Sequence, residues 1–525
     1  MVQSSGIPLP PPYKGQNDQY PLFTLSSPYC QIMDNMNNIG GVVSLRKGND
    51  KYVSVAADCL NLFSYDDTRH FLLTIGPGAT GFRFWNVSTG VAVLDNTLGF
   101  GGDDEIHTLV FKNYLFYFGE TTLRPGGAIG VPYFDGTVWG IAAYTVPTIT
   151  PLGGNVFKNR IYLIGRGTSK YGYGEIDAIA GAITEVDLST VVSTKTQLYA
   201  IRSISLSENV TQENVQAFIF ENGEVLVYGG SYPNSSSWSV ISRFRVSDII
   251  YNNTVVDAKG DSFILTKTEI LSLRNLFVGG YSKEQTEGIG ASIKKRWGQI
   301  VKAILDDSFA WAYYIKGIYD VARDRLVISF PFYVNRTTGA LTAQPFQLIY
   351  DFTLGAWYEY FQQGVSTNTS RPQTASYHRG NTYVGVQSST SQNTAVMTLE
   401  VNDNYVDDDM ETAATNAPIY YQLTSVPYPI SKFGVVKSDG LEVIMKSDLY
   451  SVTNWVLIGD LGASTTQNQK VVSINGTNVV KTFINMGIES NLIQYSLSGA
   501  STTCTVGLVI YATNLWVRPS GDISR

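Results

Sequence analysis

The sequence is poor in charged residues. Asp, Glu, Lys and Arg make up 15% of its 525 residues, against roughly 25% in an average soluble domain. The net charge is −7, which argues against general nucleic-acid binding because phosphate contacts need clustered Lys and Arg. A surface with few ions and many Ser, Thr and Asn loses little hydration energy when another subunit covers it. We therefore expect assembly with other subunits.

Cysteine and long apolar runs are also scarce. Cys30, Cys59 and Cys504 are far apart and show no metal-ligand spacing, so we expect neither a disulfide framework nor a zinc site. We expect the protein to reside in a reducing compartment. No window approaches the length of a membrane span, and the N-terminus lacks the basic and apolar regions of a signal peptide. We expect no membrane-spanning segment and no classical secretion.

The motifs of common enzyme sites are absent or incomplete. "GPGATG" at 76–81 matches a dinucleotide-binding pattern, but "FRFWNVSTG" follows it where that pattern needs a helix. The acidic runs at 103–105 and 407–411 lack the alternating ligands of a calcium loop. We therefore expect no catalytic residue, no cofactor and no metal. The histidines are isolated and lie outside any catalytic or metal-binding motif: His70, His107 and His378.

Short apolar runs introduced by polar turns dominate residues 42–400. Their β-branched and aromatic composition between Asn, Asp and Gly is typical of strands. They recur about every 55 residues, which is a spacing typical of propeller blades. We predict an all-β fold with an irregular β-propeller of about six blades over 42–400. The runs include "KNYLFYFG" from Lys112, "KNRIYLIG" from Lys158, "NGEVLVYGG" from Asn222, "KGDSFILT" from Lys259, "RDRLVISF" from Arg323 and "RGNTYVGV" from Arg379.

One turn formula occurs three times: Asn or Asp, any residue, Ser or Thr, any residue, then Gly. It stands at 86–90, 335–339 and 351–355. The Asx side chain can bond the backbone two residues later, and the Gly can adopt the left-handed conformation that closes a hairpin. Each copy predicts a hairpin.

One segment has helical periodicity. In "EGIGASIKKRWGQIVKAILDD", from Glu287, apolar residues recur at helical spacing, which predicts one helix inserted between blades. Its basic residues form the one basic cluster on a regular element. They are either a solvated helix face or a contact to DNA or to an acidic neighbouring subunit. These residues are Lys294, Lys295, Arg296 and Lys302.

The two ends of the chain differ from the propeller region. Residues 1–41 are Pro-rich and polar, which predicts an extended arm that needs another surface to be ordered. Residues 401–418 are acidic and polar and are typical of a linker. Residues 419–525 again contain strand-like runs with alternation in "LEVIMKS", which predicts a C-terminal β domain resembling a sandwich.

Four segments together resemble the β-propeller tail hub and nozzle proteins of short-tailed bacteriophages, the group that includes packaged-DNA stabilisation proteins. They are "PYCQIMDNMNNIGGVVSLRKG" (28–48), "DSFILTKTEILSLRNLF" (261–277), "YDVARDRLVISFPF" (319–332) and "LIYDFTLGAWYEY" (348–360). The order of segments is similar over most of the chain and includes a terminal β domain.

This resemblance implies a non-enzymatic virion protein, made in the host cytoplasm, whose six or so copies form a ring around the DNA conduit. Its expected partners are portal and adaptor proteins on one side, tail fibre or needle proteins on the other, and transient double-stranded DNA in the lumen. The alternative is a propeller that binds or degrades a host glycan. Paired carboxylates of a glycosidase need only be close in space, so the sequence leaves that alternative open.

Overall fold

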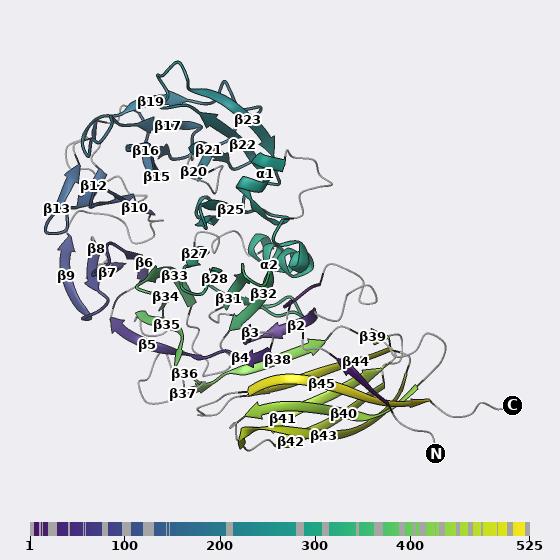
Figure 1. The fold of residues 1–525 in the computed structure, drawn as a ribbon. Coiled ribbons are helices and arrows are strands. Elements are labelled where there is room, and N and C mark those ends of the chain that lie inside the picture. Colours follow the sequence, from purple (N-terminus) through teal and green to yellow (C-terminus); the bar gives the residue numbers. More distant parts are fainter. Residues whose placement is uncertain are drawn as a thin grey trace.

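We analysed a computed structural model of the chain (Figure 1). The structure describes residues 5–9, 12, 14–18, 29–39, 42–55, 57, 59–75, 82–96, 107–118, 131–142, 144–145, 148–205, 214–279, 288–306, 314–342, 346–361, 371–387, 394–402, 406–408, 416–425, 427–429, 436–447, 452–459, 466–473, 476–490, 492–500 and 508–519. "GPGATG" and the acidic run 103–105 lie outside these residues, as do Cys504 and residues 409–411.

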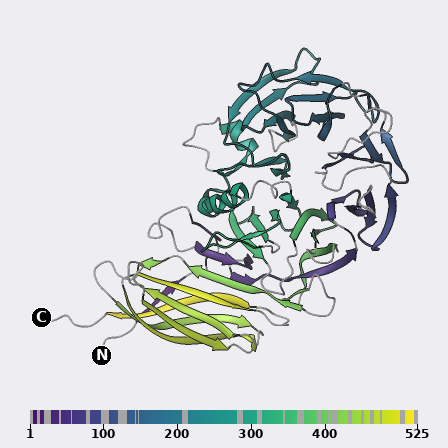
Figure 2. The same ribbon diagram turned by 180° about the vertical axis from the view of Figure 1, so that it is seen from behind.

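Within the described residues, seven antiparallel sheets fan out around a common centre and form a β-propeller (Figures 1 and 2). The predicted fold class is confirmed, with one blade more than the estimate of about six. The first four blades are β6 (Cys59–Ser64), β7 (His70–Ile75), β8 (Phe82–Asn86) and β9 (Val91–Asn96); β10 (His107–Phe111), β11 (Tyr114–Phe118), β12 (Val131–Phe134) and β13 (Trp139–Ala142); β15 (Pro151–Phe157), β16 (Arg160–Gly165), β17 (Lys170–Tyr173) and β19 (Thr184–Asp187); and β20 (Leu198–Ser205), β21 (Asn214–Phe220), β22 (Glu224–Gly229) and β23 (Ser239–Arg245).

The last three blades are less regular. The fifth has three described strands, and the seventh takes its outer strand from the start of the propeller region, which closes the ring. Their strands are β24 (Val255–Ala258), β25 (Asp261–Leu265) and β26 (Ile270–Ser272) in blade 5; β27 (Lys316–Asp320), β28 (Arg325–Phe330), β31 (Phe346–Asp351) and β32 (Ala356–Phe361) in blade 6; and β33 (Arg371–His378), β34 (Asn381–Gln387), β35 (Thr394–Asn402) and β5 (Gly48–Val55) in blade 7. Short pairs outside the blades are β14 (Tyr144–Thr145) with β18 (Gly181–Ala182), β29 (Tyr333–Val334) with β30 (Leu341–Thr342), and β36 (Val406–Asp408) with β37 (Asn416–Pro418).

Seven apolar clusters hold the ring together, one between each pair of neighbouring blades. Middle strands such as β16 and β28 therefore have both faces buried, whereas outer strands such as β23 are largely exposed. On β16, Ile161 and Leu163 join the cluster shared with blade 2, whereas Tyr162 and Ile164 join the cluster shared with blade 4. Burial on both faces explains why runs such as "RIYLIG" are continuously apolar, because alternation with polar residues occurs only where one face meets water.

Basic side chains also cross from each blade to the next. Most of them stand in or beside the turn between the first two strands of a blade. A single exposed contact of this kind contributes at most about 1 kcal/mol, so the set supplements the apolar clusters. Around the ring, the described contacts are Arg69 to the Gly136 carbonyl, Lys112 to Asp177, Lys158 to the Gly230 carbonyl, Arg202 to the Val255 carbonyl, Lys259 to Asp324, Arg325 to Glu400 and Arg379 to the Asp67 carbonyl.

The three predicted hairpins are confirmed. Asn86, Asn335 and Asp351 each accept hydrogen bonds through Oδ1 from the backbone N–H two residues later, at 2.9 to 3.0 Å. The closing residues Gly90 and Gly355 have φ of 65° and 62°, and Gly339 has the same left-handed backbone. These turns join β8 to β9, β29 to β30 and β31 to β32.

The predicted helix is α2 (Lys294–Asp306), preceded by the 3-10 turn η3 (Ala291–Ile293). Trp297, Ile300 and Ile304 face the cluster between blades 5 and 6, as the periodicity predicts. Trp297 also donates from its indole Nε1 to the Thr266 carbonyl at 3.0 Å. The helix thus covers the outer side of two neighbouring blades. The further helical elements α1 (Leu273–Gly279) and η2 (Asn252–Thr254) are short.

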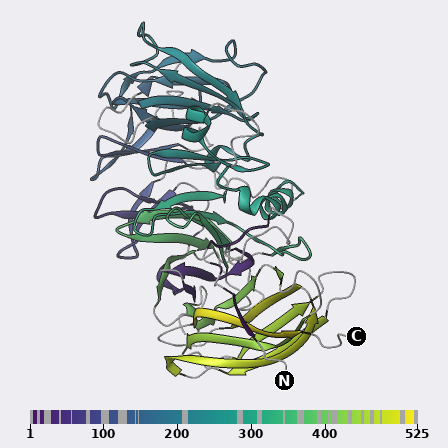
Figure 3. The same cartoon turned by 45° about the vertical axis from the view of Figure 1, so that its right-hand side comes forward.

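The C-terminal domain is a sandwich that includes the N-terminal strands (Figure 3). Segment 1–41, expected as an extended arm, contributes strands to both sheets. One sheet contains β1 (Ser5–Leu9), β3 (Met36–Ile39), β4 (Val42–Leu45), β45 (Leu508–Pro519), β40 (Val436–Ser447) and β43 (Gly476–Ser490). The other contains β2 (Cys30–Asp34), β38 (Tyr420–Ser425), β39 (Tyr428–Pro429), β44 (Leu492–Ala500), β41 (Val452–Gly459) and β42 (Thr466–Ser473).

The second sandwich sheet continues into the propeller. Strand β2 pairs in parallel with β32 at Asp34 and Glu359, and antiparallel with β38 on its other side. Blade 6 and the sandwich sheet are therefore one ten-stranded sheet. The cluster between blades 6 and 7 also extends into the sandwich and includes Met33, Trp455 and Tyr495. The two domains share both a sheet and a core.

Candidate functional site at the domain junction

A buried ion network lies where β32, α2 and the N-terminal strands meet. Arg296 on α2 forms a bidentate pair with Glu359 on β32, with Nε to Oε1 and Nη2 to Oε2 both at 3.0 Å. The two side chains are 1% and 0% exposed. Arg336 donates through Nη2 to Glu359 at 2.6 Å and to Asp34 at 3.0 Å. Two cations and two carboxylates from four segments are thus paired inside the protein.

The pairing sets the charge states in this network. Burial alone raises the pKa of Glu359, but the Arg296 and Arg336 guanidiniums outweigh burial and hold that pKa below its usual value. Burial raises the pKa of Asp34 to about 6 despite the neighbouring Arg336. Glu359 is therefore the permanent anion that the two arginines need, because buried guanidiniums without a partner carry a large desolvation penalty.

The N-terminal segment is attached to α2 by Asp18. Its carboxylate accepts hydrogen bonds from the backbone N–H groups of Lys295, at 3.1 Å, and Arg296, at 2.7 Å. These N–H groups belong to the first turn of α2, where no intrahelical partner exists and the helix dipole favours an anion. Arg336 also donates to the Gln16 side-chain oxygen at 3.0 Å. The segment therefore caps the helix and joins the ion network.

Asn35 connects three parts of the chain through one side chain. Its Nδ2 donates to the carbonyls of Phe361 and Tyr420, both at 2.6 Å. Its Oδ1 accepts from the Phe361 N–H at 2.8 Å and from Arg46 Nε at 3.0 Å. Its backbone φ is 52°, a left-handed conformation that Asn tolerates better than most residues. Blade 6, the sandwich and the N-terminal strands all meet at this amide.

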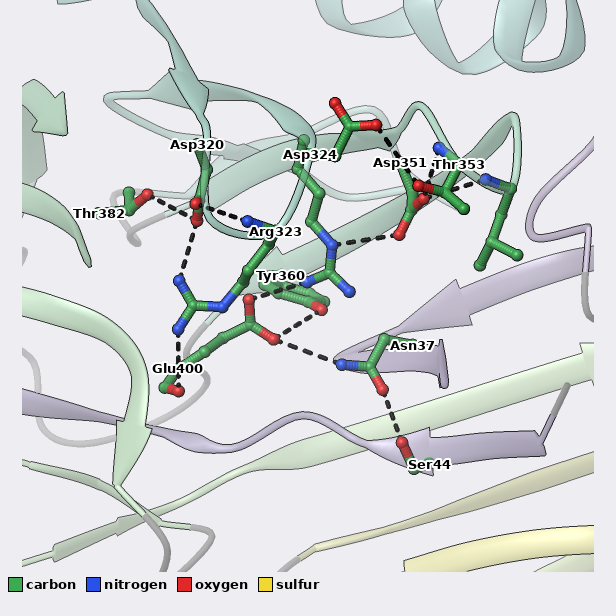
Figure 4. A network of polar contacts seen from close by, with 12 residues as sticks. Asn37, Ser44, Asp320, Arg323, Asp324, Asp351, Thr353, Tyr360, Thr382 and Glu400 are labelled. Carbon is green, nitrogen blue, oxygen red and sulfur yellow. Dashed lines mark hydrogen bonds and ion pairs between the residues drawn. The ribbon is translucent and has the colours of Figure 1, made fainter. Parts of the chain in front are cut away.

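A second network links blades 6 and 7 to β3 (Figure 4). Glu400 accepts from Arg325 at 3.1 Å, from the Tyr360 hydroxyl at 3.0 Å and from Asn37 at 3.3 Å. Arg325 also contacts Asp351 at 3.3 Å. Asn37 in turn accepts from the Ser44 hydroxyl at 2.6 Å. Every carboxylate in this network accepts a hydrogen bond or pairs with an arginine. The network therefore joins blades 6 and 7 to β3 and does not offer an open position for a ligand.

A histidine pair lies at the seam where blade 7 meets blade 1. The rings of His70 and His378 stack at 4.9 Å between centroids. His70 hydrogen-bonds Ser376 of blade 7 at 2.6 Å, and His378 hydrogen-bonds Ser64 of blade 1 at 2.9 Å. The ring of Tyr383 packs edge-on against His70 at 4.6 Å. The two blades thus exchange reciprocal imidazole–hydroxyl bonds.

Acid is expected to weaken this seam. Burial, and then the nearby His378, lower the pKa of His70 to about 3, against about 6.5 for an unperturbed histidine. Burial and Arg379 lower the pKa of His378, although Asp66 and Asp67 oppose them. The unfolded chain therefore binds more protons below about pH 6.5, so the free energy of unfolding falls there by up to about 1.4 kcal/mol per pH unit for His70, until the folded pKa is reached, and His378 acts in the same direction.

Urea unfolding of the wild type and a His70→Gln variant at pH 7 and pH 5 measures this contribution. The wild type should lose more stability than the variant on acidification, because glutamine does not titrate. Equal losses in the two proteins would show that the pair does not control the acid response.

The sequence-predicted basic residues divide into two groups. Lys294, Lys295 and Lys302 are exposed on α2. Arg296 is buried against Glu359 and does not belong to the exposed basic face, because its position turns toward blade 6. Among the described residues, no group of three or more His, Cys, Asp or Glu is arranged to hold a metal ion. None of the described helices combines the length and apolar character that a membrane crossing needs.

No family model and no curated protein matches the sequence. Solved structures do. Raptor from Chaetomium thermophilum is 8% identical, with a TM-score of 0.43 over 68% of this chain and 30% of that chain. The Swd1 β-propeller domain of Myceliophteria thermophila is 8% identical, with a TM-score of 0.41 over 66% of this chain and 99% of that chain. An exo-β-1,3-galactanase from Phanerochaete chrysosporium is 10% identical, with a TM-score of 0.25 over 84% and 100%.

The junction has no signal in the local sequence pattern. Asp34, Arg336 and Glu359 are single charges in segments that otherwise read as strand or turn, and 325 positions separate the first from the last. A local pattern gives such residues no special weight. Segments 28–48 and 348–360 meet at this junction through the pairing of Asp34 with Glu359.

Proposed function

We propose that this protein is a non-enzymatic structural subunit of a short-tailed phage virion, whose copies form a ring around the DNA conduit as a tail hub or nozzle. In this role it connects adaptor and portal proteins to distal tail parts, and it retains and then passes the genome. The observed fold on which this proposal builds is a β-propeller with an attached sandwich.

The rigid junction carries this proposal. A subunit that surrounds a packaged genome must hold its domains in a fixed relation under load. Here the two domains share a ten-stranded sheet, a common apolar core and two networks of buried ion pairs. Interfaces within a chain are usually smaller and more polar and permit domain motion. The construction of this junction fits a component that transmits force.

Two further observations support the proposal. The segments that resemble phage hub proteins, 28–48 and 348–360, form the junction together, with Asn35 bonded to the Phe361 backbone next to the second segment. The net charge of −7 also suits a conduit through which DNA slides, because an acidic wall repels phosphate.

Two assays on the purified protein separate this function from the glycan alternative. Negative-stain microscopy should show closed rings of several copies around an open centre. Incubation with host capsular polysaccharide should release no oligosaccharide. Single particles of one chain together with released oligosaccharide would overturn the structural role and support a glycan-degrading propeller.

A further inference from the structure

Helix α2 presents an exposed face that nothing in the described part of the chain covers. Five positions lie within an arc of about 100° on the helical wheel. Three are the exposed lysines, and Leu305 is 37% exposed although it is a large apolar residue. The opposite arc is buried in the cluster between blades 5 and 6. The exposed face consists of Lys294, Lys295, Gly298, Lys302 and Leu305, and the exposed Asp306 borders it beside Lys295.

Packing among the described residues does not explain why a glycine stands at position 298, at the centre of this face. A Cβ at this position would meet no heavy atom within 4 Å. Glycine in a helix interior is about 1 kcal/mol less favourable than alanine, so the residue destabilises α2 without relieving any clash here. Glycine on a helix surface allows close approach of another backbone. The position is thus suited to a partner that packs directly onto the helix.

We propose that the α2 face docks an acidic surface of a second copy of this chain, as the contact between neighbouring subunits of the ring. This inference rests on the proposed ring. Charge complementarity selects the occupant, because the face carries three exposed lysines whereas the whole chain has a net charge of −7. Covering these lysines with an acidic surface of another copy pairs them on assembly.

The geometry assigns the loop between β17 and β18 as the acidic surface. Glu175 is 76% exposed, Ile176 is 56% exposed and Asp177 is also exposed. Their present partners are Arg160 to Glu175 at 3.1 Å and Lys112 to Asp177 at 2.8 Å. Each of these ion pairs uses one carboxylate oxygen, and the side chains of Glu175 and Asp177 stay 76% and 48% exposed. The loop therefore offers two partly solvated carboxylates to the lysines of the α2 face, and Ile176 offers an apolar contact for Leu305.

The two surfaces lie on different sides of the propeller (Figure 1). The loop belongs to blade 3, whereas α2 lies between blades 5 and 6. They are thus separated by about two and a half of seven blades, roughly 130° of the circle, and a head-to-tail contact between two different surfaces closes into a ring when its rotation fits. In a six-membered ring, the two contact faces of a subunit point about 120° apart.

A Gly298→Ala variant gives the sharpest test. Alanine favours the helix, so the isolated subunit should melt at a temperature about 1–2 °C higher, while ring association measured by native mass spectrometry weakens at least tenfold. If the α2 face contacts only water, the variant should melt at the higher temperature and assemble as the wild type does. That result would overturn the inference.

Charge reversal tests the same contact independently. Lys302→Glu should weaken ring association, whereas Lys195→Glu, a matched reversal of an exposed lysine in the loop before blade 4, should leave it unchanged. Adding Glu175→Lys and Asp177→Lys to a Lys294→Glu, Lys295→Glu and Lys302→Glu variant should restore rings. Failure of this rescue, with all variants folded by circular dichroism, would overturn the assignment. Wild-type protein that forms no ring would instead overturn the proposed function, and this inference with it.

Discussion

Replacing Glu359 with glutamine is expected to lower the free energy of unfolding by about 3–5 kcal/mol, because Arg296 and Arg336 would then be buried without a full counter-charge. The replacement is nearly isosteric, so the loss measures charge pairing and not a cavity. The change should appear as a lower midpoint in urea unfolding followed by intrinsic fluorescence.

Asp257→Asn is the matched control. Asp257 also contacts an arginine, Arg202, at 3.4 Å, but its side chain is 65% exposed, and exposed pairs contribute at most about 1 kcal/mol. Similar small effects of the two substitutions would mean that the junction tolerates an uncompensated arginine, which would contradict the central place of Glu359.

An Asn35→Ala variant is expected to lose about 4 kcal/mol or more. Four hydrogen bonds to the Asn35 side chain disappear, each with a net contribution of about 1 kcal/mol. Alanine also adopts the left-handed backbone of this position less readily, at a cost of about 1–2 kcal/mol. Limited proteolysis should show the consequence as cleavage between the propeller and the sandwich.

An Asn35→Gly variant separates the two causes. Glycine adopts the left-handed conformation freely but makes none of the side-chain hydrogen bonds. It should therefore be more stable than the alanine variant by about 1 kcal/mol and less stable than the wild type. An alanine variant as stable and protease-resistant as the wild type would show that Asn35 does not hold the domains together.

The propeller could be predicted from sequence because its signal is local and repeated. Each blade contributes runs such as "RIYLIG" that are buried on both faces, and their spacing reveals the unit. The blade count was harder for two physical reasons. Blade 5 is a small sheet of three described strands, and blade 7 combines residues 371–402 with the distant strand β5. The average spacing of the apolar runs does not reveal a shortened blade. It also does not reveal a blade that is assembled from both ends of the propeller region.

The junction could not be predicted because its partners are distant in sequence. Asp34 meets Glu359, and β1 pairs with β45 near the other end of the chain. Helical periodicity placed Trp297 and Ile300 in the core correctly, but it could not separate Arg296 from the neighbouring lysines, since a buried, paired arginine and an exposed one have the same residue type. Only the position of Glu359 in the fold distinguishes them.

Native mass spectrometry of the purified full-length protein at increasing concentration tests the central claim most directly. A rigid ring-forming subunit predicts one dominant closed assembly, with a mass that is a small whole-number multiple of the chain and no open series of larger forms. A single chain at every concentration would contradict the account.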